Sequence, residues 1–395
     1  MAVPVFVLLI PSLFKLPWII MGQTGPKAKS IWYRPRGLDK LTFFGPLRAL
    51  GTSKMTADNR NLVVWLSCVC AVIYLMIVVG GVTRLTQSGL SMVDWRPIMG
   101  VIPPLTLIEW EQAFEAYKQY PEFQKINRNM GLEQFKGIFY WEFGHRLLGR
   151  VIGLVYFIPF AVFLVLGRIE KRWKPKLWLA FILGGLQGLM GWYMVKSGLV
   201  DVPHVSHFRL AAHLLLAILI LGFLFWLILD LAGVKRTRVP EGVQRLAVFM
   251  LSLLGLQLLL GAFTAGLDAG HGFNSYPLMH GQWLADAAVM MEPFWRNFIE
   301  NGVMIQFMHR WIGALLLIGV IGLAFTAARN SLLLPAIVLV VITAAQFGLG
   351  VATLMLRVPV VLGSLHQAVA CLMVLVLVYL VYVTRTPRSA SGFTE

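Results

Sequence analysis

Charged side chains are scarce in this sequence. Asp, Glu, Lys and Arg make up only 13% of the 395 residues, whereas 58% are hydrophobic and the mean hydropathy is +0.74. A soluble globular domain has about a quarter of its residues charged, so this composition excludes that class. The chain must have lipid as its solvent, and we expect an all-α membrane protein.

Acidic residues are fewer than basic ones, 18 against 34, which gives a formal net charge of +16. The basic residues stand in short clusters between apolar runs, at 27–60, 168–176 and 235–238. This distribution is typical of the positive-inside rule rather than of a nucleic-acid-binding surface. We therefore expect no nucleic-acid partner and both termini on the cytoplasmic (or matrix) side.

Cysteine is nearly absent. Cys68 and Cys70 lie in the first apolar run and Cys371 in the last, so no loop contains a cysteine pair. A disulfide or a zinc site in a loop would need such a pair. We expect no thiol chemistry.

The apolar runs are long enough to cross a bilayer, which takes about 20 residues of helix each. Two long outward loops, 83–137 and 267–301, follow the first and fifth runs, and the first of them has a helical pattern around 107–120. The sequence predicts eight spans, beginning near Leu62, Ile138, Leu177, Phe208, Leu246, Val303, Leu332 and Leu365.

The two sets of four spans resemble each other. Glu142-Phe-Gly-His145-Arg146 opens the second span, and Gln306-Phe-Met-His309-Arg310 lies at the start of the sixth. His213 and His366 sit early in the fourth and eighth spans. We predict two parallel repeated four-helix bundles, in segments 61–235 and 236–385, with an N-terminal extension at 1–60 and a C-terminal tail at 386–395.

The first 54 residues fit this plan poorly. Their apolar stretch is interrupted by Pro4, Pro11 and Pro17, and no acidic residue precedes Asp39. Such a segment is typical of targeting or of an upstream start rather than of a folded element. We expect translation to be able to begin at Met55, with a mitochondrial presequence as the alternative.

Four histidines lie inside predicted spans, where an ionisable residue is costly and indicates function. His145, His213, His309 and His366 occur at one predicted membrane level, one pair in each repeat. Two facing helices can hold a flat macrocycle between two imidazoles, so the pattern favours two heme sites. The alternatives are histidines that only pack between helices, or copper or zinc, although a structural zinc site needs four converging ligands.

The two repeats differ at one polar position. Glu142 precedes His145 by three residues, on the same helix face, whereas Gln306 occupies the matching place before His309. A buried carboxylate beside a heme could accept a proton or stabilise developing positive charge. We therefore assign the reaction, with Glu142 as catalytic residue, to the first half and a permanent redox cofactor to the second. The alternative is that Glu142 forms an i, i+4 ion pair with Arg146, and both can hold together.

Other polar residues near the outward ends have simpler interpretations. The arginines there could bind heme propionates through their guanidinium forks or extend to the interface; they are Arg146, Arg150, Arg209 and Arg310. The remaining histidines are expected in outward loops, and they are His204, His207, His271 and His280.

Over about residues 60–385 these motifs together resemble the heme A synthase family, in its mitochondrial and proteobacterial branch without cysteine pairs. The segments that carry the resemblance are Gly80-Gly-Val-Thr-Arg-Leu-Thr-Gln-Ser-Gly-Leu-Ser-Met-Val-Asp-Trp95, Glu142-Phe-Gly-His-Arg146, Gly188-Leu-Met-Gly-Trp-Tyr-Met-Val-Lys-Ser-Gly198, Phe208-Arg-Leu-Ala-Ala-His213, Gly266-Leu-Asp-Ala-Gly270 with Asn274-Ser-Tyr-Pro277, and Leu365-His-Gln367.

The resemblance implies oxidation of the C8 methyl group of heme O to a formyl group, which gives heme A for cytochrome c oxidase. It implies substrate heme at His145 and His213 with Glu142 as the catalytic carboxylate, and a heme b cofactor with iron axial ligands His309 and His366. Heme O synthase, oxidase assembly factors, membrane lipid and a second copy of the chain are the expected partners, in a bacterial inner membrane or, alternatively, a mitochondrial one. Competing interpretations are a diheme b-type electron-transfer protein and a heme carrier.

Overall fold

The structure is a computed structural model that describes residues 56–93, 100–199 and 204–385. Eight of its helices are long and apolar enough to cross a membrane, so the predicted all-α multi-pass membrane protein is confirmed. Each begins within six residues of its predicted start. The expectations for the N-terminal extension, the Met55 start and the tail lie outside the described residues. The eight helices are α2 (Ala57–Leu85), α5 (Leu132–Val165), α6 (Lys174–Lys196), α7 (His207–Leu231), α8 (Glu241–Gly266), α10 (Gly302–Arg329), α11 (Leu333–Met355) and α12 (Val360–Thr384).

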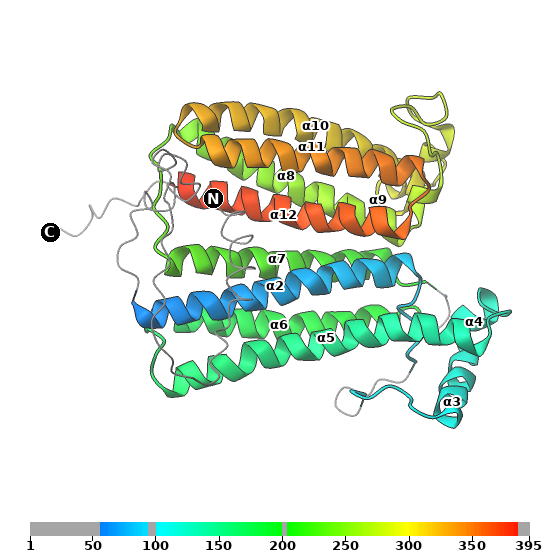
Figure 1. The fold of residues 1–395 in the computed structure, drawn as a ribbon. Coiled ribbons are helices and arrows are strands. Elements are labelled where there is room, and N and C mark those ends of the chain that lie inside the picture. The colour runs from blue at the N-terminus through cyan, green and yellow to red at the C-terminus, as the bar shows by residue number, and fades with distance from the viewer. Residues whose placement is uncertain (1–55, 94–99, 200–203, 386–395) are drawn as a thin grey trace, which may run out of the picture.

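The eight helices form two groups of four, one above the other in Figure 1. In one group α2 packs on α5 and α7, and α6 packs on α7 and α5; in the other α8 packs on α10 and α12, and α11 packs on α10 and α12. The groups meet where α2 and α7 contact α12 and α7 contacts α8. In the most apolar stretch of α12, 78% of residues are buried inside the protein, against 6% in α6, so α12 lies at the centre and α6 faces lipid.

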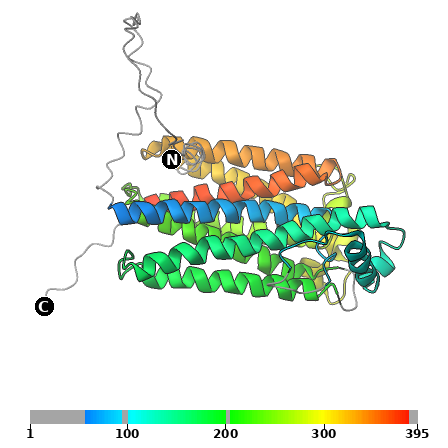
Figure 2. The same ribbon diagram turned by 60° about the horizontal axis from the view of Figure 1, so that its bottom comes forward.

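The two long connections lie at the same end of the helices, to the right in Figure 1 and again in Figure 2. We call this the long-loop end. The first connection carries α3 (Leu107–Lys118), which confirms the predicted helix there, and α4 (Pro121–Lys125). The second carries the short helices η2 (Ala269–His271), η3 (Asp286–Val289), η4 (Phe294–Arg296) and α9 (Asn297–Glu300).

The first connection is held to the helix bundle by aromatic packing. A capping box between Thr106 and Glu109 begins α3, which satisfies backbone donors at that end. Its apolar face lies on the first turns of α5, so these turns are fixed before the helix reaches His145. The buried residues of this cluster are Trp110, Phe114, Tyr117, Phe135, Phe139 and Phe143.

Candidate functional site

The four predicted histidines lie on four different helices, each in the half nearest the long-loop end. His145 is on α5 and His213 on α7, in the first group of helices. His309 is on α10 and His366 on α12, in the second group. Each group therefore contains two intramembrane histidines on separate helices.

The pair in the second group has the spacing of two ligands on one metal ion. The ring centroids of His309 and His366 are 6.4 Å apart, with an interplanar angle of 81°. A metal–imidazole bond of about 2.0 Å, with about 1.1 Å more from nitrogen to ring centre, puts two axial rings roughly 6 Å apart. The separation of the two rings therefore matches that of two imidazoles on one metal ion.

The pair in the first group is arranged differently. His145 and His213 are close enough to interact electrostatically, but among the described residues they make no ring contact like that of His309 and His366. The two rings of the first pair are therefore not in direct contact, unlike those of the second pair.

Each of the four rings faces a glycine on a neighbouring helix. A Cβ built on Gly80 would lie 3.0 Å from Nε2 of His145, and one on Gly191 would lie 3.0 Å from Cε1 of His213. In the second group the same distances to Cε1 are 3.1 Å from Gly261 to His309 and 2.8 Å from Gly350 to His366. At Gly350 a Cβ would force a shift, and at the other three glycines the ring would have to move by a few tenths of an ångström. The glycines therefore leave room for the rings.

A glutamine accompanies three of the four rings. It stands four residues before the facing glycine, one helical turn away. Nε2 of Gln187 lies 3.4 Å from Nε2 of His213, and Nε2 of Gln257 lies 3.5 Å from Nε2 of His309. For Gln346 the distance to Nε2 of His366 is 3.3 Å.

Several polar atoms around the rings lack a hydrogen-bond partner among the described residues. They are buried, and a buried polar atom without a partner is destabilising. A polar or metal-containing group bound between the helices would lie among them. With paired imidazoles and facing glycines, these atoms make the residues fit a heme in each group. The atoms are Nδ1 of His213 and His309 and Oε1 of Gln187, Gln257 and Gln346.

Glu142 is only 2% exposed, and three donors surround its carboxylate. Arg146 donates to Oε1 at 2.5 Å, and Ser91 Oγ and the main-chain N–H of Met92 donate to Oε2 at 2.8 and 2.6 Å. The predicted i, i+4 ion pair with Arg146 is thus present. Glu142 thus attaches the loop segment after α2 to the helix α5.

The matching residues of the second group do the same with a neutral side chain. Gln306 donates to the main-chain carbonyls of Ala269 and Gly272 at 2.8 and 2.7 Å, and Arg310 donates to Gln306 Oε1 at 3.0 Å. Arg310 also donates to the carbonyls of Phe273 and Ser275. We call these hydrogen bonds from residue 142 or 306 to the neighbouring loop the loop clamp. Because Gln306 makes the clamp without a carboxylate, the clamp alone does not explain why position 142 is a glutamate.

Three of the four arginines proposed for propionates have other partners. Arg146 donates to Glu142 and to the carbonyl of Met92. The terminal nitrogens of Arg310 donate to loop carbonyls. Arg209 donates to the carbonyl of Tyr193 at 2.9 Å, with its guanidinium 3.7 Å from the centre of that ring. Arg150 lies one turn beyond Arg146 on α5.

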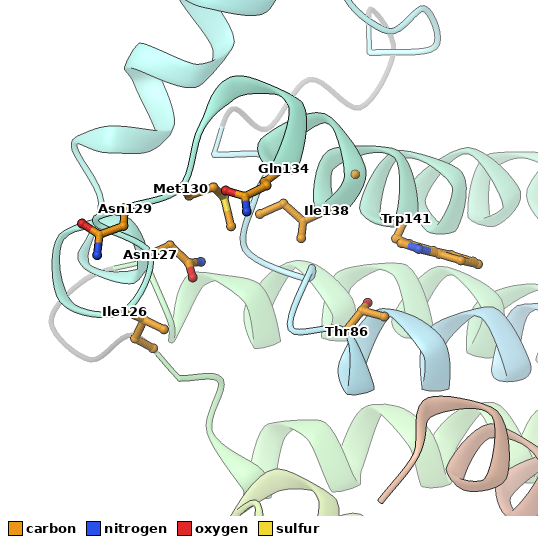
Figure 3. A pocket seen from close by; sticks show the side chains of 9 residues that line it. Thr86, Ile126, Asn127, Asn129, Met130, Gln134, Ile138 and Trp141 are labelled. Atoms are coloured by element: carbon orange, nitrogen blue, oxygen red, sulfur yellow. The ribbon is translucent and has the colours of Figure 1, made fainter.

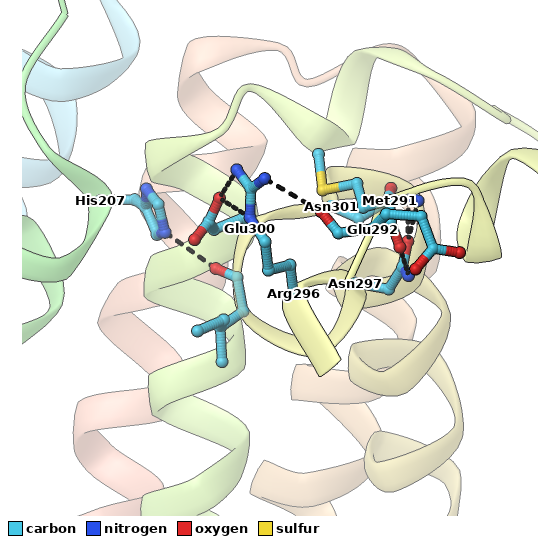
Figure 4. Close-up of polar contacts among 8 residues, drawn as sticks. His207, Met291, Glu292, Arg296, Asn297, Glu300 and Asn301 are labelled. Carbon is cyan, nitrogen blue, oxygen red and sulfur yellow. Dashed lines mark hydrogen bonds and ion pairs between the residues drawn. The ribbon is translucent and has the colours of Figure 1, made fainter. Parts of the chain in front are cut away.

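The expectation that His207 lies in a loop is wrong. His207 is the first residue of α7, and its Nε2 lies 2.8 Å from the carbonyl oxygen of Ile299 in the second long connection. Figure 4 shows this contact beside the Arg296–Glu300 ion pair, whose shorter contact is 2.5 Å. This ion pair and its hydrogen bonds lower the pKa of Glu300. His207 thus joins the two groups of helices at the long-loop end.

A hollow of 580 Å³ opens at the long-loop end between the end of α2 and the first turns of α5 (Figure 3). The buried Glu122 lies in the same connection and accepts from the Tyr117 hydroxyl at 2.9 Å. Burial raises the pKa of Glu122 to about 7, although the Tyr117 hydrogen bond acts in the opposite direction. The residues that line the hollow are Thr86, Ile126, Asn127, Asn129, Met130, Gln134, Gly137, Ile138 and Trp141.

Comparison with known proteins gives the family. Residues 63–378 match the family described as cytochrome oxidase assembly protein, COX15-CtaA. A heme A synthase of Parvibaculum lavamentivorans is 45% identical over 315 residues, which cover 80% of this chain and 92% of the relative. The chain belongs to the heme A synthase family. Other relatives in this family are the heme A synthases of Nitrosospira multiformis, 44% identical over 82% of this chain and 93% of the relative, and of Nitrosomonas eutropha, 45% identical over the same two shares.

The glycines and glutamines around the rings were not predicted from the sequence. Gly191, for example, lies against the ring of His213. A detectable signal was present, because Gln-x-x-x-Gly occurs once in each of three spans. The occurrences are Gln187 to Gly191, Gln257 to Gly261 and Gln346 to Gly350.

Proposed function

We propose that this chain makes heme A by oxidising the C8 methyl group of heme O to a formyl group. Segment 61–235 binds heme O between His145 and His213, and segment 236–385 binds heme b between His309 and His366. The observation that carries this proposal is the presence of two histidine pairs of which only one has a buried carboxylate, Glu142, beside it. Family membership supports the same reaction.

Heme iron supplies the redox chemistry that side chains lack. The chain's own residues bind the heme and orient it. The imidazoles would hold the heme iron, and the facing glycines let the rings stand between helices. Oxidation of a methyl to a formyl group also releases protons, and the buried Glu142 carboxylate is the acceptor placed in the substrate half. Arg146 and Ser91 hold that carboxylate in one orientation.

The halves are products of one duplication. Beyond the histidines and glycines, the turn after each first helix supports this: Gln87 and Asp268 stand seven residues beyond Gly80 and Gly261, and both have φ of 52°. An unusual left-handed residue at matched positions reflects a shared backbone path.

The protein lies in a bacterial inner membrane with both termini in the cytoplasm and the long-loop end outward; a mitochondrial inner membrane is the alternative. The basic clusters at 168–176 and 235–238 support this orientation. The partners that we propose are heme O synthase, oxidase assembly factors and a second copy of the chain.

The deciding experiment is pigment extraction and mass analysis from cells that make heme O, with and without this protein. Heme A is expected only when the protein is present. If heme O persists unchanged while the purified protein still holds heme, the protein is a diheme electron-transfer protein and not a synthase. That second function is favoured by one observation, the equivalent loop clamps of Glu142 and Gln306.

A further inference from the structure

One of the four histidines lacks the glutamine that accompanies the others. The residue four positions before Gly80 is Met76, where the three other helices have Gln187, Gln257 and Gln346. Met76 belongs to the helix that faces His145, and His145 is the ring whose pair is not in ring contact. The exception therefore falls in the half that we propose to bind the substrate.

The three glutamine positions fasten the histidines through main-chain hydrogen bonds. Nε2 of Gln187 donates to the carbonyl of His213 at 3.0 Å, and Nε2 of Gln257 donates to the carbonyl of His309 at 2.9 Å. In the third case Nδ1 of His366 lies 3.1 Å from the carbonyl oxygen of Gln346 itself. A carbonyl that accepts from one ring nitrogen, as that of Gln346 does for His366, fixes the orientation of a metal-binding histidine. The amides of Gln187 and Gln257 fix the helix turns that carry His213 and His309.

Met76 fills the same space without a hydrogen-bond donor. Its Cε would lie 3.4 Å from a Cβ on Gly149, one turn beyond His145. In the second half Nε2 of Gln257 would lie 3.0 Å from a Cβ on Gly313, one turn beyond His309. Among the described residues, no side-chain amide holds the His145 ring.

We propose that Met76 makes His145 the exchangeable ligand, so that the first half can take up heme O and release the product. This rests on the proposed function, because only a substrate heme has to leave after each turnover. The glutamines at the other rings hold their ligands, and Gln257 and Gln346 together keep the cofactor heme in place. Met76 is thus a positioning residue that acts through His145.

The test measures heme loss from the full-length protein loaded with heme O and heme b, kept oxidised and without reductant so that no turnover occurs. Excess apomyoglobin captures released heme, and mass analysis of the remaining pigment identifies which heme has left. Wild-type protein should lose heme O faster than heme b. Met76→Gln should slow the loss of heme O about fivefold, which corresponds to one neutral hydrogen bond.

The matched control is Met76→Leu, which keeps the size without adding a donor and should not slow heme O loss. An unchanged rate of heme O loss from a folded Met76→Gln protein would overturn the proposal. If that variant does not fold, Gln257→Met decides: it should speed the loss of heme b about fivefold, and an unchanged rate would overturn the proposal. If the pigment experiment yields no heme A, the proposed synthase function fails. The Met76 proposal is judged separately, because the rates of heme loss can still be measured.

Discussion

Gly81 on α2 lies against the side chain of Gln367 on α12, so closely that a Cβ at Gly81 would be 2.5 Å from Gln367 Oε1. The Gln367 amide is not free to move away, because its Nε2 donates to the carbonyl of Ile77 at 2.8 Å. This contact joins the two groups of helices directly beside His366 and Gly80.

Gly81→Ala should therefore destabilise the protein by about 1–3 kcal/mol, the usual cost of overpacking. The measurement is the free energy of unfolding in mixed detergent micelles. In a Gln367→Ala background the same substitution should cost less than half as much, since the obstructing amide is gone. Equal costs in both backgrounds would show that the contact does not limit the packing.

Glu142→Gln should keep the fold and both hemes, because Gln306 performs the same loop clamp in the second half. Heme A formation should fall at least about a hundredfold, as expected for loss of a general acid–base group. Extracted heme A per mole of protein measures the effect. Normal heme A formation would make Glu142 a structural residue only.

His309→Ala and His366→Ala should each lose the heme b cofactor, because the iron loses an axial ligand. Heme content per mole of purified protein, from pigment extraction, measures this. His271→Ala is the control, since that histidine is exposed in η2. A normal bound-heme spectrum in either of the first two variants would refute the ligand assignment.

Gly350→Ala should weaken heme b binding, because its Cβ would lie 2.8 Å from Cε1 of His366 and would turn the ring. Gly348→Ala is the matched control: it lies two residues away on the same helix, and nothing stands within 4 Å of its Cβ position. Heme b retention after detergent dialysis compares the two. The ring does not need the glycine if both variants retain heme equally.

The first connection should loosen as pH rises. Burial raises the pKa of Glu122 from its ordinary value of 4.5 to about 7, so the folded segment holds a proton that the opened segment releases. Its stability should fall from pH 4.5 to 7 and level off above that range. Amide hydrogen exchange in α3 and α4, corrected for the intrinsic rate at each pH, measures this, and Glu122→Gln should flatten the dependence.

Hydropathy located all eight spans because the bilayer imposes length and composition on each helix separately. The four histidines were found because an ionisable residue inside a span stands out from its neighbours. The surroundings of Glu142 could not be found in this way, since Ser91 and Met92 reach it only through tertiary folding. The mistake at His207 was one of boundary: the predicted span began one residue later, and sequence patterns do not fix helix ends that finely.

α12, the most enclosed of the eight spans in the described part of the chain, follows the other seven in sequence, and this sets the order in which they pack. α2 and α7 pack on α12, so the faces of these two helices that contact α12 stay uncovered until α12 is inserted. A chain that stops before Val360 would present those faces to lipid or to other proteins. Quality control that senses unpaired membrane helices would therefore detect the loss of α12 through the uncovered faces of α2 and α7.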